Sequence, residues 1–262
     1  MSWRCRAVVF DWAGTMIDFG SFAPMGVFVE AFATFGIEAT IEEARGPMGA
    51  PKRAHIQAMM AAPSIRSQWE ARHGRAPTEA DVDEVYAVFV PMNEEVVAQY
   101  AVLVPGAKAT FDWLKARGMK VGSTTGYVRS IMERVLPVAA EQGYAPDNLV
   151  CADDLAEGRP GPLGMYQCFV DLAVHPPSAV IKVDDTAPGI LEGVAAGCVT
   201  VGVALSGNHV GLTPEALGAL SEAEVDRLRR GATEALREAG ADHVIDSVAD
   251  LPELIERLEA AG

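Results

Sequence analysis

Acidic and hydroxyl side chains follow three short apolar runs of this sequence. Asp11 comes directly after AVVF, Thr125 comes shortly after MKVGS, and Asp184 and Asp185 come directly after AVIKV. The β-branched and apolar residues of these runs predict buried strands. In an open α/β sheet, ligands bind beyond the carboxyl ends of the strands, so these side chains would share one pocket. Asp11 and Asp185 are therefore expected to hold a divalent cation, with Mg²⁺ as the ion that prefers such oxygen ligands.

The same acids allow simpler interpretations. Asp11 with the following Gly14 could form an ordinary turn. Either Asp184 or Asp185 could cap a helix that begins near Thr186, and the sequence leaves open which of the two would contact a metal ion.

Two further features could bind an anion. Thr125 and Gly126 stand where a strand passes into a helix, and a hydroxyl with a flexible backbone at a helix N-terminus is a ready anion site. Arg159 lies in a stiff loop, GRPGP, and could neutralise a phosphoryl group. An ordinary surface arginine beside a proline is the alternative interpretation.

A lysine with a possible chemical role lies in a helical part of the chain. Lys52 follows Pro51 in the first turn of a predicted helix, where the helix dipole disfavours the ammonium and favours the free amine that attacks carbonyl groups. His55 lies three residues further on the same predicted face and could transfer protons. A solvated lysine on a helix face is the alternative.

The order of predicted elements indicates how these residues are positioned. Between Phe22 and Tyr100, spacing and capping signals predict helices and no strand, at 24–37, 40–46, 51–60, 64–74 and 78–100. The capping signals are the boxes Thr40–Glu43 and Thr78–Asp81, with Ser64 as the cap of the helix at 64–74. From Pro105 on, helices alternate with strands predicted at 119–123, 148–151, 179–183, 200–205 and 243–245, and the last helices are expected around 221–239 and 251–260. This order predicts an α/β fold with a doubly wound parallel sheet. We expect a core domain of residues 1–20 and 101–262, interrupted by an all-helical cap domain of residues 21–100.

Composition and net charge argue against some classes of partner and location. The chain has 262 residues, half of them hydrophobic, which suffices for a core with an inserted domain. A formal net charge of −15 without a run of basic residues argues against a nucleic-acid partner. No apolar run reaches membrane-spanning length or forms a signal-peptide core. The four cysteines show no metal-ligand spacing, so we expect reduced thiols and a cytoplasmic protein.

Together these motifs resemble those of the haloacid dehalogenase superfamily. The resemblance rests on Asp11 with its strand, the stretch 123–127 (STTGY), Arg159 in its loop, and the pair Asp184-Asp185. It implies a Rossmann-like core in which Asp11 is a nucleophile that forms an aspartyl intermediate, usually an aspartyl phosphate. It also implies a Mg²⁺ ion held by Asp11, Ala13, Asp184 and Asp185.

Ala13 and Lys52 make the resemblance more specific. Phosphatases of the superfamily carry a proton-donating Asp two positions after the nucleophile, where this chain has Ala13, so we expect poor hydrolysis of phosphate monoesters. DWAGT combined with PMGxxKxxHI closely resembles the phosphonatase branch, in which a cap lysine forms a Schiff base with the substrate aldehyde. The resemblance implies hydrolysis of the carbon–phosphorus bond of phosphonoacetaldehyde to acetaldehyde and phosphate, in 2-aminoethylphosphonate degradation. The substrate contacts that it implies are Met48, His55, Thr125, Gly126, Tyr127 and Arg159, with Asp11 and Lys52 as catalytic residues.

The chain departs from the pattern of the branch at two places. Leu163 and Gly164 stand where we expect a Trp-Met pair, which leaves the pocket wall near Arg159 undefined. Gly189 stands where some members have a further Asp, which indicates that Asp184 takes over the metal-shell role of that missing acid.

The sequence leaves two alternative functions and the oligomeric state open. A magnesium-dependent phosphatase or phosphomutase of the same fold, and an inactive paralogue that binds a phosphonate or a partner protein, are the alternatives. The resemblance implies a homodimer through the cap, and the apolar Met25, Phe28 and Phe32 are consistent with such an interface or with ordinary core packing.

Overall fold

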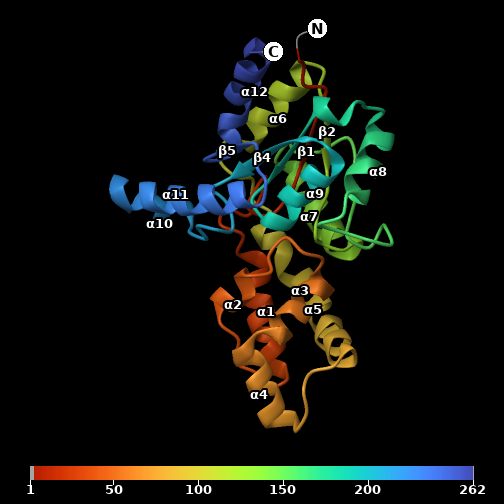
Figure 1. The fold of residues 1–262 in the computed structure, drawn as a ribbon, viewed down its shortest axis with the longest axis vertical. Helices are drawn as coiled ribbons and strands as arrows, with labels where there is room; N and C mark the ends of the chain where they lie inside the picture. Colours follow the sequence, from red (N-terminus) through yellow and green to blue (C-terminus); the bar gives the residue numbers. More distant parts are fainter. Residues whose placement is uncertain (1–2, 262) are drawn as a thin grey trace.

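A parallel sheet of five strands forms the centre of the α/β part of the molecule (Figure 1). The structure is a computed structural model and describes residues 3–261. The order β2-β1-β3-β4-β5 places β1 between β2 and β3. This confirms the α/β fold and shows that Asp11 and Asp185 follow neighbouring strands. The strands are β1 (Ala7–Phe10), β2 (Lys120–Ser123), β3 (Val180–Asp184), β4 (Val199–Val203) and β5 (His243–Ile245).

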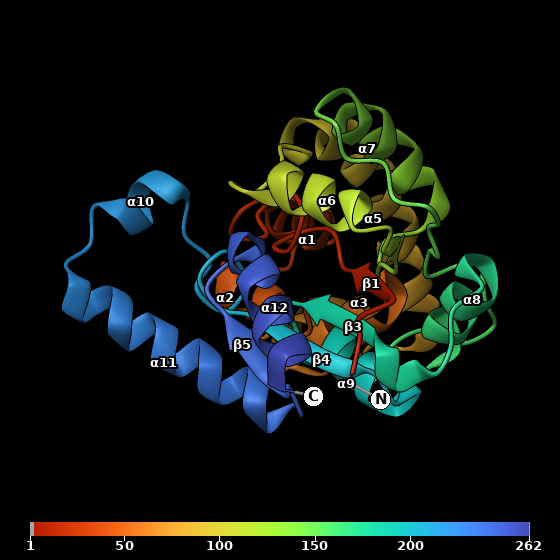
Figure 2. The same cartoon turned by 90° about the horizontal axis from the view of Figure 1, so that it is seen from above.

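Side chains of the interior strand β1 alternate between two apolar layers. Val8 and Phe10 pack into the layer that includes residues of α6 (Ala107–Ala116), α7 (Arg129–Glu141) and α12 (Leu251–Ala261). Ala7 and Val9 pack into the layer that includes α8 (Leu163–Leu172) and the last residue of α9 (Ala187–Ala196). Seen from above, α6 and α8 lie on opposite sides of the sheet (Figure 2). Burial on both faces explains why β1 reads as an uninterrupted apolar run.

Five of the helices between the first two strands lie beyond one end of the sheet, whereas the sixth, α6, packs on the sheet itself (Figure 1). Within the described residues, this confirms the prediction of helices without strands between Phe22 and Tyr100. None of the helices in the described part of the chain is both long and apolar enough to cross a membrane. The five helices are α1 (Ala23–Thr34), α2 (Ile41–Arg45), α3 (Lys52–Ala61), α4 (Pro63–His73) and α5 (Glu79–Tyr100).

Two connecting segments join these helices to the sheet and run side by side. The Asp18 amide donates to the Val102 carbonyl at 3.0 Å, and the Val104 amide donates to the Met16 carbonyl at 2.9 Å. The Asp18 carboxylate accepts the amides of Phe22 at 3.0 Å and Ala23 at 2.8 Å, which satisfies the start of α1. The chain therefore leaves and re-enters the sheet region at adjacent points.

Two of the three predicted helix caps are present in the structure. The boxes Thr40–Glu43 and Thr78–Asp81 are present at the starts of α2 and α5. The prediction that Ser64 caps α4 is wrong, because the helix begins at Pro63 and the Ser64 hydroxyl bonds the Glu43 carboxylate.

The strand predicted at 148–151 is also wrong. A lone bridge between Thr124 and Val150 joins this segment to the sheet. The Asn148 side chain accepts the Ser123 amide at 3.3 Å, and the Ser123 hydroxyl donates to the Asn148 carbonyl at 3.0 Å. Backbone bonds join Val150 to the Thr125 amide at 3.1 Å and to the Ser123 carbonyl at 2.9 Å, and beyond them bonds of the Asn148 and Ser123 side chains take the place of ladder bonds, a competition that is common for Asn and Ser. In the C-terminal part, α10 (Pro214–Gly218) was not predicted, whereas α11 (Glu222–Glu238) was.

Candidate active site

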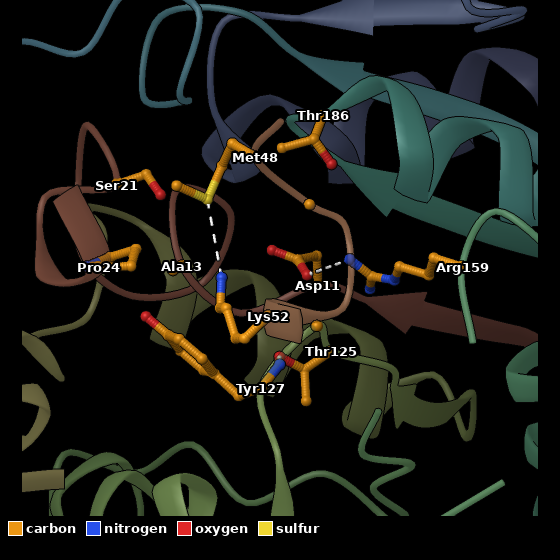
Figure 3. Close-up of a pocket in the computed structure, with 12 residues that line it drawn as sticks. Asp11, Ala13, Ser21, Pro24, Met48, Lys52, Thr125, Tyr127, Arg159 and Thr186 are labelled. Carbon is orange, nitrogen blue, oxygen red and sulfur yellow. Dashed lines mark hydrogen bonds and ion pairs between the residues drawn. The ribbon is translucent and has the colours of Figure 1, made fainter. Parts of the chain in front are cut away.

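A cavity lies where the helical segment meets the carboxyl ends of the strands (Figure 3). About 290 Å³ of space that no atom fills lies between its lining residues, and part of this space is open to solvent. Residues from the helical segment and from the sheet region both line it, so two parts of the chain that are distant in sequence build one site. The lining residues are Asp11, Ala13, Ser21, Pro24, Met48, Gly49, Lys52, Thr125, Gly126, Tyr127, Arg159 and Thr186.

Asp11 and Arg159 form a buried ion pair in this cavity. Arg159 Nη1 donates to Asp11 Oδ1 at 2.8 Å, and Figure 3 shows the guanidinium pointing at the carboxylate. Asp11 is fixed by its place at the end of β1, where its amide donates to the Val183 carbonyl at 3.0 Å. Arg159 is only 7% exposed, so the interpretation of an ordinary surface arginine is excluded.

Asp11 also belongs to a group of three buried carboxylates. Oxygens of Asp11, Asp184 and Asp185 lie within 4.8 Å of one another. Burial, together with repulsion from Asp184, raises the pKa of Asp11 to about 6 despite the nearby Arg159. Burial and the two neighbouring carboxylates raise the pKa of Asp185 well above its ordinary value. Buried like charges of this kind are relieved by a cation, and oxygen ligands suit Mg²⁺.

Asp184 offers one carboxylate oxygen as a candidate ligand for such an ion. Asp184 Oδ1 accepts the amide and hydroxyl of Thr186 at 3.0 and 2.7 Å, so Asp184 is the acid that serves the helix start. Its Oδ2 forms ion pairs but accepts no hydrogen bond from the described residues. A Cβ on Gly189 would lie 1.8 Å from that oxygen, so Asp184 fills the space that a side chain at 189 would need. The donor set therefore fits a divalent cation, and Ala13 could add only its backbone carbonyl.

Asp185 has a different environment from Asp184. Its Oδ2 accepts the Asn208 amide at 2.7 Å, and its Oδ1 lies 3.4 Å from the Thr15 hydroxyl. Gly14 adopts φ +85°, and a Cβ there would lie 2.1 Å from Asp185 Oδ2. The glycine after Asp11 therefore allows the loop to approach Asp185 closely.

Lys52 is buried in the cavity, and none of the carboxylates of residues 3–261 lies within hydrogen-bonding distance of it. Its Nζ lies 3.9 Å from Met48 Sδ and 4.8 Å from the centroid of the Tyr127 ring. Figure 3 shows the contact between Lys52 and Met48 as a dashed line. Burial lowers the pKa of Lys52 from 10.5 to about 8, and the attraction of Asp11 offsets only part of this effect. The first turn of α3 begins at Lys52. A solvated lysine is thereby excluded, because the residue is only 4% exposed.

The other predicted contacts divide into two groups. Met48, Thr125, Gly126 and Tyr127 line the cavity, and Thr125 Oγ1 accepts the Tyr127 amide at 3.1 Å. His55 does not line it: Nε2 lies 2.8 Å from the Ala44 carbonyl oxygen, and the ring stacks on Phe28. Burial and the nearby Lys52 lower the pKa of His55 well below its ordinary value. The structure thus places His55 behind Lys52, away from the substrate space.

Several residues of the site were missed from the sequence. Ser21 and Thr186 line the cavity, and the buried Ser21 hydroxyl has no partner among the described residues. Ser21 adopts φ +55°, which no sequence pattern indicated. Glu192 and Lys182 are buried next to Arg159, yet in the sequence they look like ordinary residues of a helix and a strand.

Two sequence expectations about neighbouring residues need correction. Gly164 faces Glu192 rather than the cavity, and Leu163 is 38% exposed, so the place of the expected Trp-Met pair is not a wall of this cavity. Met25, Phe28 and Phe32 are buried within the chain itself, which makes them core residues and removes them as candidates for a dimer surface.

Comparisons with known proteins agree with this geometry. The profile of the haloacid dehalogenase-like hydrolase family matches residues 5–197. A phosphonoacetaldehyde hydrolase of Paraburkholderia phytofirmans is 49% identical over 255 residues, which cover 97% of this chain and 96% of that protein. A protein of the same name from Klebsiella pneumoniae is 48% identical over 259 residues, covering 98% and 96%.

Solved structures show the same relationship. The crystal structure of a phosphonoacetaldehyde hydrolase-like protein from Oleispira antarctica superposes with a TM-score of 0.95 at 45% identity, covering 99% of this chain and 96% of that one. A putative β-phosphoglucomutase from Bacteroides vulgatus superposes with a TM-score of 0.69 at 21% identity, covering 99% and 91%, and shares the fold.

Proposed function

This chain belongs to the haloacid dehalogenase-like hydrolases, and we propose that within this family it hydrolyses the carbon–phosphorus bond of phosphonoacetaldehyde to acetaldehyde and phosphate. The observation that carries the proposal is the pairing of two groups in one cavity. A buried amine, Lys52, faces the space next to the carboxylate of Asp11. Ala13 lines the same space and supplies no proton donor.

The amine of Lys52 solves the main chemical difficulty of the reaction. Direct hydrolysis of a carbon–phosphorus bond would leave a carbanion. Condensation of the substrate aldehyde with the free amine releases water and forms an iminium, which accepts the electrons of the breaking bond and becomes an enamine. Protonation and hydrolysis of that enamine release acetaldehyde and restore the amine. The lowered pKa of Lys52 favours the first step, because only the free amine attacks the aldehyde.

Asp11 and its neighbours act on the phosphoryl group. A carboxylate oxygen of Asp11 attacks phosphorus as the carbon–phosphorus bond breaks, and water then hydrolyses the aspartyl phosphate. Arg159 and the hydroxyl of Thr125 line the cavity next to Asp11 and would bind phosphoryl oxygens. Asp11, Asp184, Asp185 and the Ala13 carbonyl would hold Mg²⁺, which when bound neutralises charge on the phosphoryl oxygens.

Residues 21–100 act in this proposal as a cap domain that must open for the substrate and close for reaction. Lys52 lies in this segment, whereas Asp11 lies in the remaining core, so the two side chains line one cavity only when the cap is closed. Arg45 supports closure: its Nη1 donates to Asn208 Oδ1 at 3.1 Å and to the Gly20 carbonyl at 2.9 Å. Because the Asn208 amide also donates to Asp185, this contact joins the cap to the candidate metal site.

A homodimer and a cytoplasmic location remain predictions within this proposal. A dimer through the cap must use residues other than the buried Met25, Phe28 and Phe32. All four cysteines are free thiols, which agrees with a reducing compartment. The proton-transfer role expected of His55 has no support in the geometry, and we propose instead that its ring packs the Phe28 side chain beneath Lys52.

The activity assay measures acetaldehyde and phosphate released from phosphonoacetaldehyde in the presence of Mg²⁺. We expect equal amounts of both products from the wild type and none from Lys52→Arg, which keeps a cation but has no attacking amine. The exposed Lys120→Arg is the matched control and should keep wild-type rates. Hydrolysis of p-nitrophenyl phosphate that survives Lys52→Arg, without cleavage of the phosphonate, would instead favour a phosphatase. The absence of any magnesium-dependent turnover would favour an inactive paralogue.

A further inference from the structure

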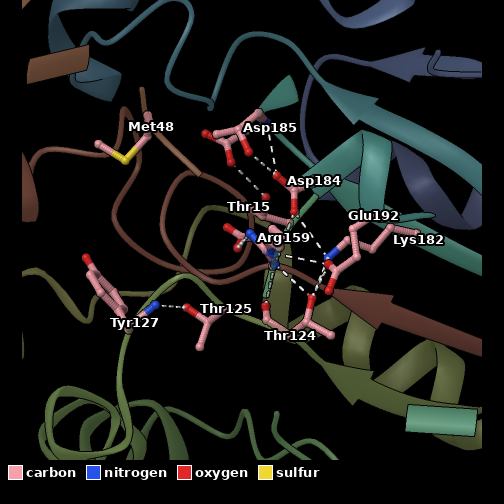
Figure 4. A network of polar contacts seen from close by, with 12 residues as sticks. Thr15, Met48, Thr124, Thr125, Tyr127, Arg159, Lys182, Asp184, Asp185 and Glu192 are labelled. Atoms are coloured by element: carbon pink, nitrogen blue, oxygen red, sulfur yellow. Dashed lines mark hydrogen bonds and ion pairs between the residues drawn. The ribbon is translucent and has the colours of Figure 1, made fainter. Parts of the chain in front are cut away.

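Glu192 is a buried acid outside the substrate cavity that contacts three polar side chains of the site region (Figure 4). Its Oε2 accepts hydrogen bonds from Arg159 Nε at 3.1 Å and from the Thr124 hydroxyl at 2.7 Å. The same oxygen lies 3.1 Å from Lys182 Nζ. Glu192 is 2% exposed, so it does not touch the bulk solvent and must act through these neighbours.

The hydroxyl of Thr124 links the members of this group. It accepts from Arg159 Nη2 at 2.8 Å and from Lys182 Nζ at 2.7 Å, and it donates to Glu192 Oε2. A hydroxyl has one hydrogen to donate and two lone pairs to accept, so all of its capacity is used. Each of these hydrogen bonds therefore has a fixed donor and a fixed acceptor, and the Thr124 hydroxyl cannot rotate without losing one of them.

Strand and helix geometry bring the charges to one face of the sheet. Lys182 and Asp184 are two residues apart on β3 and point to the same side, and Glu192 lies on α9, which packs on β3 and β4. Lys182 Nζ lies 3.2 Å from Asp184 Oδ2, and Arg159 Nη2 lies 3.4 Å from it. Two buried cations thus face three buried anions, because Asp11 also accepts from Arg159 Nη1. A buried charge is costly unless it is paired, so removal of Glu192 would leave Lys182 Nζ and Arg159 Nε without this carboxylate partner.

A glycine leaves the space in which Glu192 lies. A Cβ on Gly164 would be 2.6 Å from Glu192 Oε1, closer than side-chain atoms approach one another. Any larger residue at 164 must therefore displace the carboxylate that holds Arg159.

We propose that Glu192 is a positioning residue that, together with Thr124, orients the Arg159 guanidinium toward Asp11 and the phosphoryl group. Glu192 holds the Nε side of the guanidinium and Thr124 holds Nη2, so that Nη1 is left to reach Asp11. The inference rests on the proposed role of Asp11 and Arg159 in phosphoryl transfer. It adds that the position of Arg159 depends on an acid outside the cavity.

The main test combines Glu192→Gln with Arg159→Lys in a double-mutant cycle. Two quantities are measured in the presence of Mg²⁺: kcat for phosphonoacetaldehyde, and the affinity for inorganic phosphate by calorimetry. Glu192→Gln keeps the shape but gives Arg159 and Lys182 an amide that carries no charge. We expect kcat to fall about 100-fold, as for other misplaced groups that bind a transition state, and phosphate affinity to weaken. In the Arg159→Lys background, Glu192→Gln should change either quantity by less than about threefold, because residues that act as a unit are not additive.

Controls separate positioning from loss of the fold and from the proposed function. Glu157→Gln changes an exposed acid on the loop of Arg159 and should keep wild-type values. Borohydride trapping of the substrate on Lys52 at saturating concentration should persist in Glu192→Gln, because imine formation does not use Arg159. Absence of wild-type turnover would contradict the proposed function, whereas the phosphate affinities would still test the inference. An unchanged kcat and phosphate affinity in Glu192→Gln, or independent losses in the cycle, would overturn it.

If Glu192→Gln does not fold, Gly164→Ala provides the same test from the other side of the carboxylate. Its added methyl would displace Glu192 without removing the charge. A folded Gly164→Ala protein, checked by circular dichroism, should also lose kcat and phosphate affinity. Wild-type values in that protein would contradict the proposed positioning role.

Discussion

The pKa of Lys52 allows the most quantitative prediction. Burial lowers it from 10.5 to about 8, and within the described part of the chain no carboxylate hydrogen-bonds to the ammonium. At pH 7 about 9% of Lys52 is then free amine, against about 0.03% for a lysine with a pKa of 10.5, a roughly 300-fold difference. Because the depressed pKa favours the neutral form, the free-amine fraction rises with pH through 8. From pH 7 to 9 it should rise about tenfold and then level off.

Competitive labelling with trace acetic anhydride from pH 6 to 11 measures this titration without any substrate. The chain has five lysines, so peptide mass mapping separates Lys52 from the others, and Lys52→Arg verifies the assigned peptide. We expect the labelling of Lys52 to reach half its maximum near pH 8. A midpoint at pH 10 or above would refute the reasoning, because labelling would then rise about 100-fold between pH 7 and 9 without a plateau.

Three further changes test other parts of the site. Removal of divalent cations by EDTA should abolish turnover and Mg²⁺ should restore it; full activity after chelation would contradict the role of the three clustered carboxylates. Gly189→Asp should inactivate the enzyme, because its Cβ would lie 1.8 Å from Asp184 Oδ2, and Asp184→Gly in the same chain should restore measurable kcat. A double variant no better than the single one would contradict this explanation. Ala13→Asp adds a proton donor to the cavity and should raise hydrolysis of p-nitrophenyl phosphate about 100-fold; an unchanged rate would show that a missing acid is not what limits it.

The sequence predicted those parts of the fold and cavity that depend on local patterns. Strand runs that end in Asp11 and Asp185 placed both acids at one edge of a parallel sheet, and the structure shows the two strands as neighbours. Lys52 was identified from a motif and a helix start, and it lies in the same cavity as Asp11. Local patterns were misleading where a polar side chain competes with the backbone, as Asn148 does beside Ser123.

The remaining parts depend on tertiary contacts that no spacing reveals. Glu192 lies 33 positions after Arg159 in the sequence, and only the packing of α9 on the sheet brings the two together. His55 shares a helix with Lys52, yet tertiary packing turns its ring toward Phe28 rather than into the cavity. The sequence showed that an Asp at 184 accompanies a Gly at 189, but it did not show that the Asp184 carboxylate occupies the space that a side chain at 189 would need.

The central claim is that the amine of Lys52 forms an imine with the substrate while Asp11 receives the phosphoryl group. Sodium borohydride added during turnover of phosphonoacetaldehyde reduces such an imine to a stable secondary amine. The account predicts loss of activity and a single substrate-derived mass increase on the peptide that contains Lys52, with none on the peptides of Lys108, Lys115 or Lys120. Continued phosphate release with no adduct on Lys52 would contradict it.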